Sequence, residues 1–257
     1  MTAREHARLL DDLRARIARL ERRDGASRAA VVTFGIKEID RALPGGGLAR
    51  GALHEVAGRG PDVEHGAAAA LLIAGLLART RGPVLWVSAQ RDLFAPALAG
   101  VGLAPARVIH VEAGRAVLLA MEEGLRHPGL AGVVGEVAGP LGLTASRRLQ
   151  LAAEASGVIA FALRRSRRFD DPRLAEPTAA DTRWRVSALP SPPPLAHAPE
   201  TPGLGPPRWR LELVRARGGA AASWIVEGGD AQGGLRLAAD LADGSAAPVA
   251  PERRASA

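Results

Sequence analysis

Four positions in a short turn have the composition of a loop that binds phosphate groups. Gly58, Arg59, Gly60 and Gly66 follow an apolar stretch at 52–57 and precede a long apolar helix. A strand, a glycine-bearing turn and a helix in this order present backbone N–H groups to phosphate oxygens. The chemistry that this order predicts is nucleotide binding, with hydrolysis of the terminal phosphate as the reaction.

The side chains that such a loop needs are missing. A lysine after the last glycine holds the β- and γ-phosphates, and the next serine or threonine binds Mg²⁺. Alanines follow Gly66 instead, and the only lysine of the chain, Lys37, precedes the turn. Asp62 and Glu64 would repel phosphate, and Arg59 is not placed like the missing ammonium. We therefore expect no ATP turnover and no required cofactor; weak nucleotide binding by the loop amides stays open.

No metal-binding or nucleophilic pattern assembles elsewhere in the sequence. The six histidines are scattered without the spacing of metal ligands. The chain has no cysteine, which excludes disulfides and thiolate metal sites and fits a cytoplasmic protein. Thr144 reads as the N-cap of a helix rather than as a nucleophile. For Glu136, an ion pair with Arg147 or Arg148 is the structural expectation.

The composition is that of a globular protein with basic character. Of its 257 residues, 47% are hydrophobic and 24% are charged. No signal peptide is recognisable, and the apolar run at 67–78 is too short to span a membrane. The net charge of +7 comes from 33 arginines and one lysine. This excess favours contact with nucleic acid or an acidic protein, or reflects a genome that uses arginine where lysine would serve.

The N-terminal residues, 1–24, predict an amphipathic helix that is separate from the main domain. A narrow apolar stripe recurs at helical spacing, and arginines cover the other faces. The stripe either packs against its own domain or binds a partner or a second copy. A linker at 25–30 follows the helix. The stripe consists of Leu10, Leu13, Ile17 and Leu20.

Residues 31–243 alternate between short apolar strands and helices. Apolar strands separated by helices predict an α/β domain with a mostly parallel central sheet covered on both faces. The last two strands, at 208–215 and 223–227, have no helix between them and predict a C-terminal antiparallel hairpin. Loops are expected at 164–180 and in the proline-rich stretch at 190–207, and a disordered tail at 244–257.

The order of these elements resembles the core of RecA-type recombinases over about residues 31–230. The glycines before residue 52 resemble the segment ahead of that family's phosphate loop, which is here degenerate. The strand at 84–87 resembles the one that ends in the family's catalytic glutamate, and the resemblance places Gln90 there. It also places Glu136 at the acidic position that supports Mg²⁺. The loop at 164–180 falls where the family's second DNA-binding loop lies.

Several uncommon strings are similar, in order, to the ImuA family, the RecA-like members of bacterial inducible mutagenesis cassettes. This resemblance implies a role in the SOS response to DNA damage, in error-prone translesion synthesis. It implies three partners: the Y-family-like protein ImuB, a DnaE-type polymerase and RecA. The strings are Met121–Arg126, Gly135–Val137, Thr144–Ala155, Thr182–Val186, Pro207–Arg210 and Trp224–Glu227.

Arginines and an aromatic residue stand together in the loop that the resemblance assigns to DNA. Guanidinium groups neutralise phosphates, and a phenylalanine ring can stack on a base of single-stranded DNA. The same cluster could equally be a solvated run of charge. The candidate residues are Arg164, Arg165, Arg167, Arg168 and Phe169.

The sequence thus favours a non-catalytic accessory protein that acts through protein contacts and through DNA. The competing hypotheses are an active DNA-dependent ATPase or recombinase, and a cell-division inhibitor that resembles SulA. Trp184 and Trp209, each between two arginines, are expected to be core indoles with the guanidinium groups outside.

Overall fold

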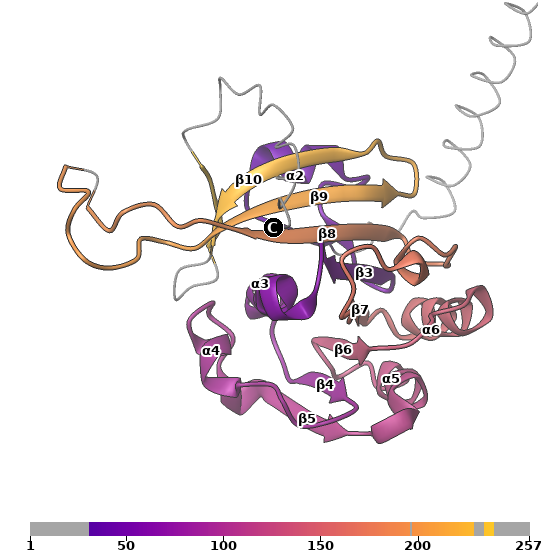
Figure 1. Cartoon of the computed structure of the whole chain (residues 1–257). Helices are drawn as coiled ribbons and strands as arrows, with labels where there is room; N and C mark the ends of the chain where they lie inside the picture. Colours follow the sequence, from indigo (N-terminus) through magenta and orange to yellow (C-terminus); the bar gives the residue numbers. More distant parts are fainter. Residues whose placement is uncertain (1–30, 196, 229–233, 239–257) are drawn as a thin grey trace, which may run out of the picture.

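A computed structural model of the chain describes residues 31–195, 197–228 and 234–238. Within these residues the main sheet has nine strands in the order β11-β10-β9-β8-β3-β7-β6-β4-β5. Figure 1 shows the sheet as a twisted layer with helices on both sides. The predicted N-terminal helix with its stripe Leu10, Leu13, Ile17 and Leu20, the linker at 25–30 and the tail at 244–257 lie outside the described residues.

One half of the sheet is parallel, as the sequence predicts. Its strands are buried along almost their whole length, which explains why they read as continuous apolar runs. Strand β5, at the edge, is the exception and is half-exposed. The strands are β3 (Leu53–Gly58), β4 (Val84–Ser88), β5 (Val108–Glu112), β6 (Gly132–Val137) and β7 (Ile159–Arg164).

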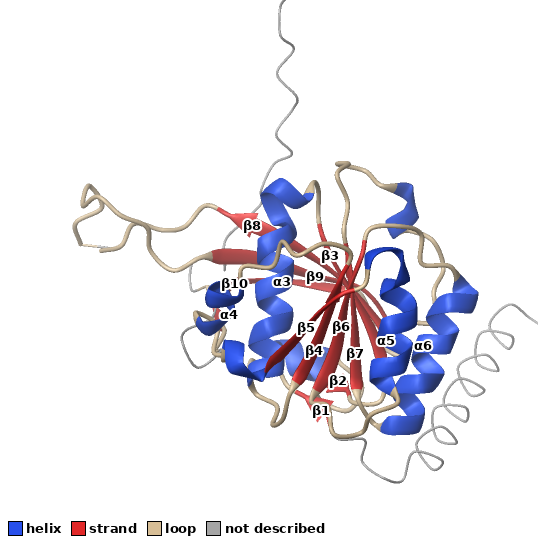
Figure 2. Cartoon of the chain, turned by 90° about the horizontal axis from the view of Figure 1, so that it is seen from below, coloured by secondary structure: helices blue, strands red, loops and turns tan. Residues whose placement is uncertain are grey.

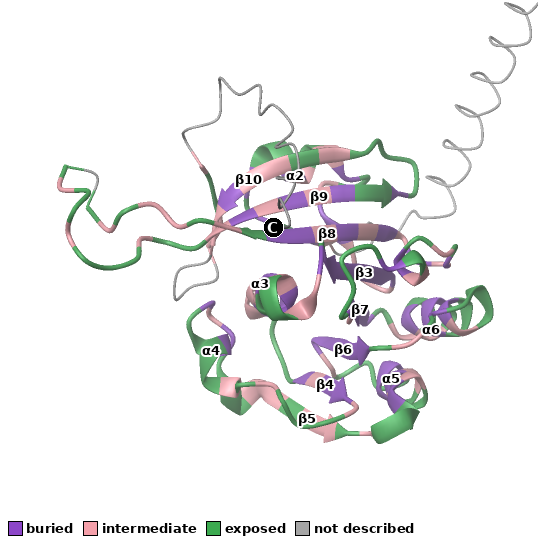
Figure 3. Cartoon of the chain, viewed as in Figure 1, coloured by how far each residue is buried: buried purple, intermediate pink, exposed green. Residues whose placement is uncertain are grey.

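Helices cover the two faces of this parallel half. Figure 2 shows α3 (Asp62–Ala78) and α4 (Ala95–Ala99) on one face, and α5 (Val117–Leu125) and α6 (Leu143–Ser156) on the other. Each face has its own cluster of buried apolar side chains. Figure 3 shows β3 and β6 buried and β5 intermediate to exposed, while the outer surfaces of the helices are exposed.

The other half of the sheet is an antiparallel meander of β8 (Thr182–Leu189), β9 (Arg208–Ala216), β10 (Ala222–Glu227) and β11 (Arg236–Leu237). Strand β8 joins the two halves because it pairs in parallel with β3 and antiparallel with β9. The predicted C-terminal hairpin is therefore confirmed as β9 and β10.

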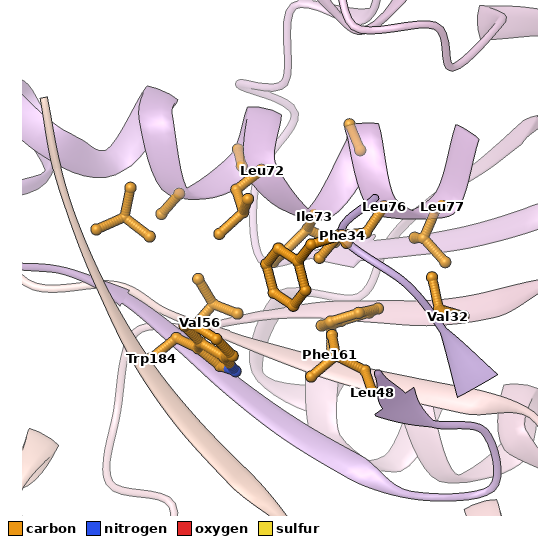
Figure 4. Packing of buried hydrophobic residues seen from close by; sticks show 14 of the residues in the cluster. Val32, Phe34, Leu48, Val56, Leu72, Ile73, Leu76, Leu77, Phe161 and Trp184 are labelled. Carbon is orange, nitrogen blue, oxygen red and sulfur yellow. The ribbon is translucent and has the colours of Figure 1, made fainter. Parts of the chain in front are cut away.

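Both tryptophans with flanking arginines are core residues, as predicted. Trp184 is 1% exposed, and its ring centroid lies 4.9 Å from that of Phe34. Figure 4 shows Phe34 beside Ile73 of α3, and Trp184 beside Val56 of β3. Trp209 is also buried, on β9.

A small structure before β3 was not predicted from the sequence. It consists of β1 (Val31–Val32), α2 (Lys37–Ala42) and β2 (Leu48–Ala49), with β1 and β2 paired antiparallel. The carboxylate of Asp40 accepts the amides of Phe34 and Gly35, at 2.7 and 3.1 Å. This turn directs the Phe34 side chain into the core.

Two local expectations were wrong. Helix α3 begins at Asp62, not at Gly66, so that the predicted loop is one helical turn shorter. Thr144 is not an N-cap, because α6 begins at Leu143 after Gly142, and no side chain caps the helix. Among the described residues no helix is long and apolar enough to cross a membrane.

Candidate functional site

The site predicted from the sequence lies at the carboxyl ends of the parallel strands, where β3 leads into α3. A pocket of about 920 Å³ opens at this edge of the sheet. Ligands of open α/β sheets bind outside the carboxyl ends of the strands, so this is the expected place for a nucleotide. The pocket is lined by Asp62, Gln90, Asp92, Glu136 and Arg165, among others.

The loop at the base of this pocket is much shorter than a phosphate-binding loop. Only Arg59, Gly60 and Pro61 separate β3 from α3. Residues 62–65 form the first turn of the helix, in which the amides of Glu64 and His65 donate to the carbonyl of Pro61 at 3.0 and 3.2 Å. A helical turn therefore occupies the position where the sequence predicts a cradle.

Two backbone amides that could bind an anion, those of Arg59 and Asp62, are already paired. The amide of Arg59 donates to the carbonyl of Val186 at 2.9 Å, and that of Asp62 donates to the carbonyl of Ser166 at 2.8 Å. Pro61 has no amide hydrogen. The guanidinium of Arg59 pairs with Glu212 of β9 at 2.5 Å. The amides of Arg59 and Asp62 and the guanidinium group of Arg59 therefore already have partners within the protein.

The glycines of the predicted loop make room for protein side chains. A Cβ atom on Gly58 would lie 3.0 Å from Cβ of His65, and one on Gly60 would lie 3.2 Å from Cδ2 of the same ring. Gly66 lies inside α3, where a Cβ atom would come within 2.8 Å of Nη1 of Arg165. These glycines accommodate His65 and Arg165.

Glu136 is the charged centre of the site. Its carboxylate accepts Nε1–H of Trp86 at 2.7 Å, and Nε and Nη2 of Arg165 at 3.0 and 2.9 Å. The expected pair with Arg147 or Arg148 was wrong, because Arg148 pairs with Glu122 at 2.7 Å. Arg148 lies on α6, outside this edge, whereas Arg165 follows β7, which lies next to β6.

Arg165 lies between two of the acidic groups of the site, Glu136 and Asp62. It binds Glu136 on one side, and on the other it faces Asp62 and Gly66 in the first turns of α3. Burial raises the pKa of Asp62, and the nearby Arg165 guanidinium opposes that shift. The site therefore holds a cation of its own, supplied from β7 instead of from the loop.

Gln90 lies at the mouth of the pocket, beyond the end of β4. It lines the same pocket as Glu136, which agrees with the placement that the resemblance implied. The hydroxyl of Ser88 donates to the carbonyl of Gln90 at 2.7 Å and fixes the chain there. An amide can orient a water molecule but cannot take its proton near neutral pH.

Arg164 is not part of an exposed DNA-binding loop. It is the last residue of β7, is 2% exposed and pairs with Glu55 of β3 at 2.9 Å. Arg183 of β8 reaches the same carboxylate at 3.1 Å, and the hydroxyl of Thr178 donates to it. The prediction for Arg164 was wrong, since a buried guanidinium cannot contact DNA phosphates. Arg165 is also mostly withdrawn, because it is committed to Glu136.

Three of the predicted loop residues remain accessible. Arg167, Arg168 and Phe169 are exposed, and the Phe169 side chain is 66% exposed. They follow Ser166, which is buried and whose carbonyl accepts the amide of Asp62. The exposed tip of the loop is thus anchored at its base to the start of α3.

Asp171 holds the other end of this tip. Its carboxylate accepts the hydroxyl of Ser166 at 2.9 Å and Nη2 of Arg173 at 2.6 Å. These donors hold the pKa of the Asp171 carboxyl well below its usual range. Together Ser166 and Asp171 close residues 167–170 into a compact loop.

This arrangement predicts a pH dependence of stability. A carboxyl with a lowered folded-state pKa stabilises the fold above the unfolded-state pKa, near 4, and loses this contribution as the pH falls below it. We expect Asp171→Asn to be less stable than the parent at pH 7, and the difference to shrink between pH 4 and pH 2. Urea unfolding across this pH range measures it. A constant difference would contradict the assignment.

Sequence reasoning missed the buried charge cluster of Glu55, Arg164 and Arg183. The signal was present, because Glu55 and Arg164 are single charged residues inside otherwise apolar strand segments, LHEVAG and IAFALR. Charges at such positions are seldom buried unless they are paired. Glu55 and Arg164 are 109 residues apart in the chain, so that predicting their ion pair requires knowledge of the strand order.

Comparisons with known proteins add the relationship that the geometry alone does not give. The chain is 44% identical over 237 residues to Protein ImuA of Caulobacter vibrioides, in each of two strains, with 87% of this chain and 95% of the relative covered. No protein-family model matches it. The crystal structure of the RadB recombinase is similar in fold, with a TM-score of 0.55 and 17% identity. That match covers 80% of this chain and 99% of the RadB chain, and it supports the RecA-like fold.

Proposed function

The chain belongs to the ImuA family, and on this premise we propose that it is a non-catalytic accessory protein of inducible, error-prone translesion synthesis. In this proposal a RecA-like fold has lost ATP hydrolysis and acts through contacts with proteins. The partners are those of the family's mutagenesis cassette: the Y-family-like protein ImuB, a DnaE-type polymerase and RecA. The protein works in the cytoplasm, after DNA damage.

One observation carries the proposal. At the carboxyl ends of β3 and β6, a helical turn and the Arg165–Glu136 ion pair stand where a phosphate-binding loop and its lysine would be. Loss of a single group that stabilises the transition state typically costs about 3 to 4 kcal/mol. Here the lysine, the Mg²⁺-binding hydroxyl and the carboxylate at position 90 are all absent. The combined loss supports a protein that does not turn over ATP.

The rival function is a DNA-dependent ATPase, and the two are separated by a direct assay. We expect the purified protein, with and without single-stranded DNA, to release no phosphate from ATP above the background rate. Equilibrium titration with labelled ATP measures any residual binding. Phosphate release that is lost in the Gln90→Ala variant would overturn the proposal.

The exposed tip of the loop, residues 167–169, is the part of the candidate DNA loop that can contact DNA. We expect Arg167→Ala with Arg168→Ala to weaken retention of single-stranded DNA, because two guanidinium groups no longer neutralise phosphates. The slope of log affinity against log salt should fall by about 1.4 for two lost contacts. Fluorescence anisotropy over a salt series measures both quantities.

A matched control uses the same change of charge at another surface. Arg115→Ala with Arg147→Ala removes two exposed arginines that lie away from the pocket. An equal loss of DNA binding in this variant would mean that net charge alone is responsible. Unchanged binding in the Arg167 and Arg168 variant would reject the loop.

The partners are tested by co-purification from DNA-damaged cells. We expect tagged protein to retain ImuB, RecA or the DnaE-type polymerase, and reconstitution from purified components to show which contact is direct. Retention of none of the three, with a folded protein, would contradict the proposed role.

A further inference from the structure

A groove between α5 and α6 is not used by the site described above. These two helices pack side by side on one face of the sheet (Figure 2). Their outward surfaces enclose a groove of about 550 Å³. The groove lies on the face of the sheet opposite to α3. It shares no lining residue with the pocket at the carboxyl ends of the strands.

The floor of the groove is apolar and follows one face of α6. Leu151, Ala152 and Ala155 recur at helical spacing on this face, and Pro128 follows the end of α5. The Leu151 side chain is 52% exposed. Within the described residues, nothing covers this apolar strip.

Charged side chains form one side of the groove. Glu122 of α5 accepts Nη2 of Arg148 at 2.7 Å and Nη2 of Arg126 at 3.2 Å. Arg126 also pairs with Glu123 at 3.2 Å, so that two arginines and two glutamates lie beside the apolar strip. Both guanidinium groups are largely exposed and can donate hydrogen bonds to a further carboxylate.

The part of the chain outside the structure joins the fold close to this groove. Val31 pairs with Ala49, two residues before Gly51. The Cα atoms of two paired residues lie about 5 Å apart, and two residues along a chain span at most about 7 Å. Val31 therefore lies within about 12 Å of Gly51. A Cβ atom on Gly51 would lie 3.3 Å from the carbonyl oxygen of Ala153 and 3.4 Å from Cα of Gly157, at the end of α6. Val31, the first described residue, therefore lies near the C-terminal end of α6.

We propose that the amphipathic helix predicted at residues 3–23 docks in the α5–α6 groove of its own chain. The linker at 25–30 can span up to about 20 Å, enough to place the last turn of the helix over Ala155. A short tether gives the helix a millimolar effective concentration at the groove. The inference does not depend on the proposed function.

The spacing of the apolar residues in the predicted stripe matches the spacing of the residues that line the groove on α6. When the last turn of the predicted helix lies at the C-terminal end of α6, the predicted helix and α6 run in the same direction. Leu20 then lies near Ala155, and Ile17 lies near Leu151. Leu20 follows Leu13 by seven positions, and Ala155 follows Arg148 by the same number.

Charge complements this alignment at the far end of the groove. Asp12 precedes Leu13, which places an acidic side chain at the level of Arg148. Asp11 and Asp12 are the acidic pair of a helix whose other faces are mainly arginine.

The absence of native cysteine allows a clean cross-linking test. Full-length variants carry the pair Ile17→Cys with Leu151→Cys, or the pair Leu20→Cys with Ala155→Cys. A disulfide forms only when the two Cα atoms approach within about 7 Å. The control pair is Ile17→Cys with Leu119→Cys, because Leu119 is similarly exposed, at 57%, but does not line the groove.

We expect at least one groove pair to form an intramolecular disulfide several-fold faster than the control pair, as measured on non-reducing gels. Adding Leu13→Glu to that pair should reduce the rate to that of the control. Equal rates for both groove pairs and the control would overturn the inference. Cross-linking only between chains, detected by mixing single-cysteine variants, would also overturn it and would assign the groove to a second copy.

Discussion

Replacing Glu55 by glutamine is expected to lower the free energy of unfolding by about 3 to 5 kcal/mol. The buried carboxylate of Glu55 neutralises Arg164 at 2.9 Å and Arg183 at 3.1 Å. Glutamine keeps the shape but removes the charge, so that Arg164, which is 2% exposed, stays buried as an unpaired cation. Urea unfolding followed by circular dichroism measures the difference.

The matched control for this variant is Glu123→Gln, which removes the same charge from an exposed ion pair with Arg126. Exposed pairs contribute less than about 1 kcal/mol. If Glu55→Gln fails to fold, Arg164→Met gives a graded test, because Glu55 then keeps Arg183 as its partner. A loss below about 1 kcal/mol for Glu55→Gln would contradict the role of this cluster.

The second large effect is expected at Glu136. Glu136→Ala removes the acceptor for the indole N–H of Trp86 and the only ion-pair partner that we find for Arg165 in the described residues. A buried donor without an acceptor costs about 1 to 3 kcal/mol, and an unpaired buried charge costs more. We expect a loss of about 3 kcal/mol or more in the free energy of unfolding.

Asp92→Ala is the control for Glu136, since Asp92 lines the same pocket and has no ion pair among the described residues. Its removal is expected to change stability by less than about 0.5 kcal/mol. Equal effects of the two substitutions would mean that Glu136 has no structural role at this edge. The comparison thus tests whether this acidic residue now stabilises the fold.

The two predictions describe one feature of the molecule. At the carboxyl ends of β3, β6 and β7, acidic groups are neutralised by arginines of the same chain. Arg164, the last residue of β7, and Arg165, which follows it, pair with Glu55 and Glu136 separately. Two acidic side chains of this part of the sheet are thus balanced by arginines of the same chain.

The sequence by itself determined the class of fold and the position of the site. Apolar strands that alternate with helices predicted the parallel half of the sheet, and the short turn at 217–219 predicted the hairpin of β9 and β10. The missing lysine and hydroxyl after Gly66 were readable directly. These features are local, because periodicity and turn composition depend on residues that are close in the chain.

Only the tertiary structure decided which side chains meet. Arg164 and Arg165 stand in an arginine-rich run that reads as a surface loop, yet one is buried against Glu55 and the other is held by Glu136. The start of α3 at Asp62 likewise depends on Ser166, whose carbonyl accepts the first amide of the helix. Arg164 and Glu55 are 109 positions apart in the chain, and Arg165 and Glu136 are 29 apart. Their pairing follows from strand order, which local pattern does not specify.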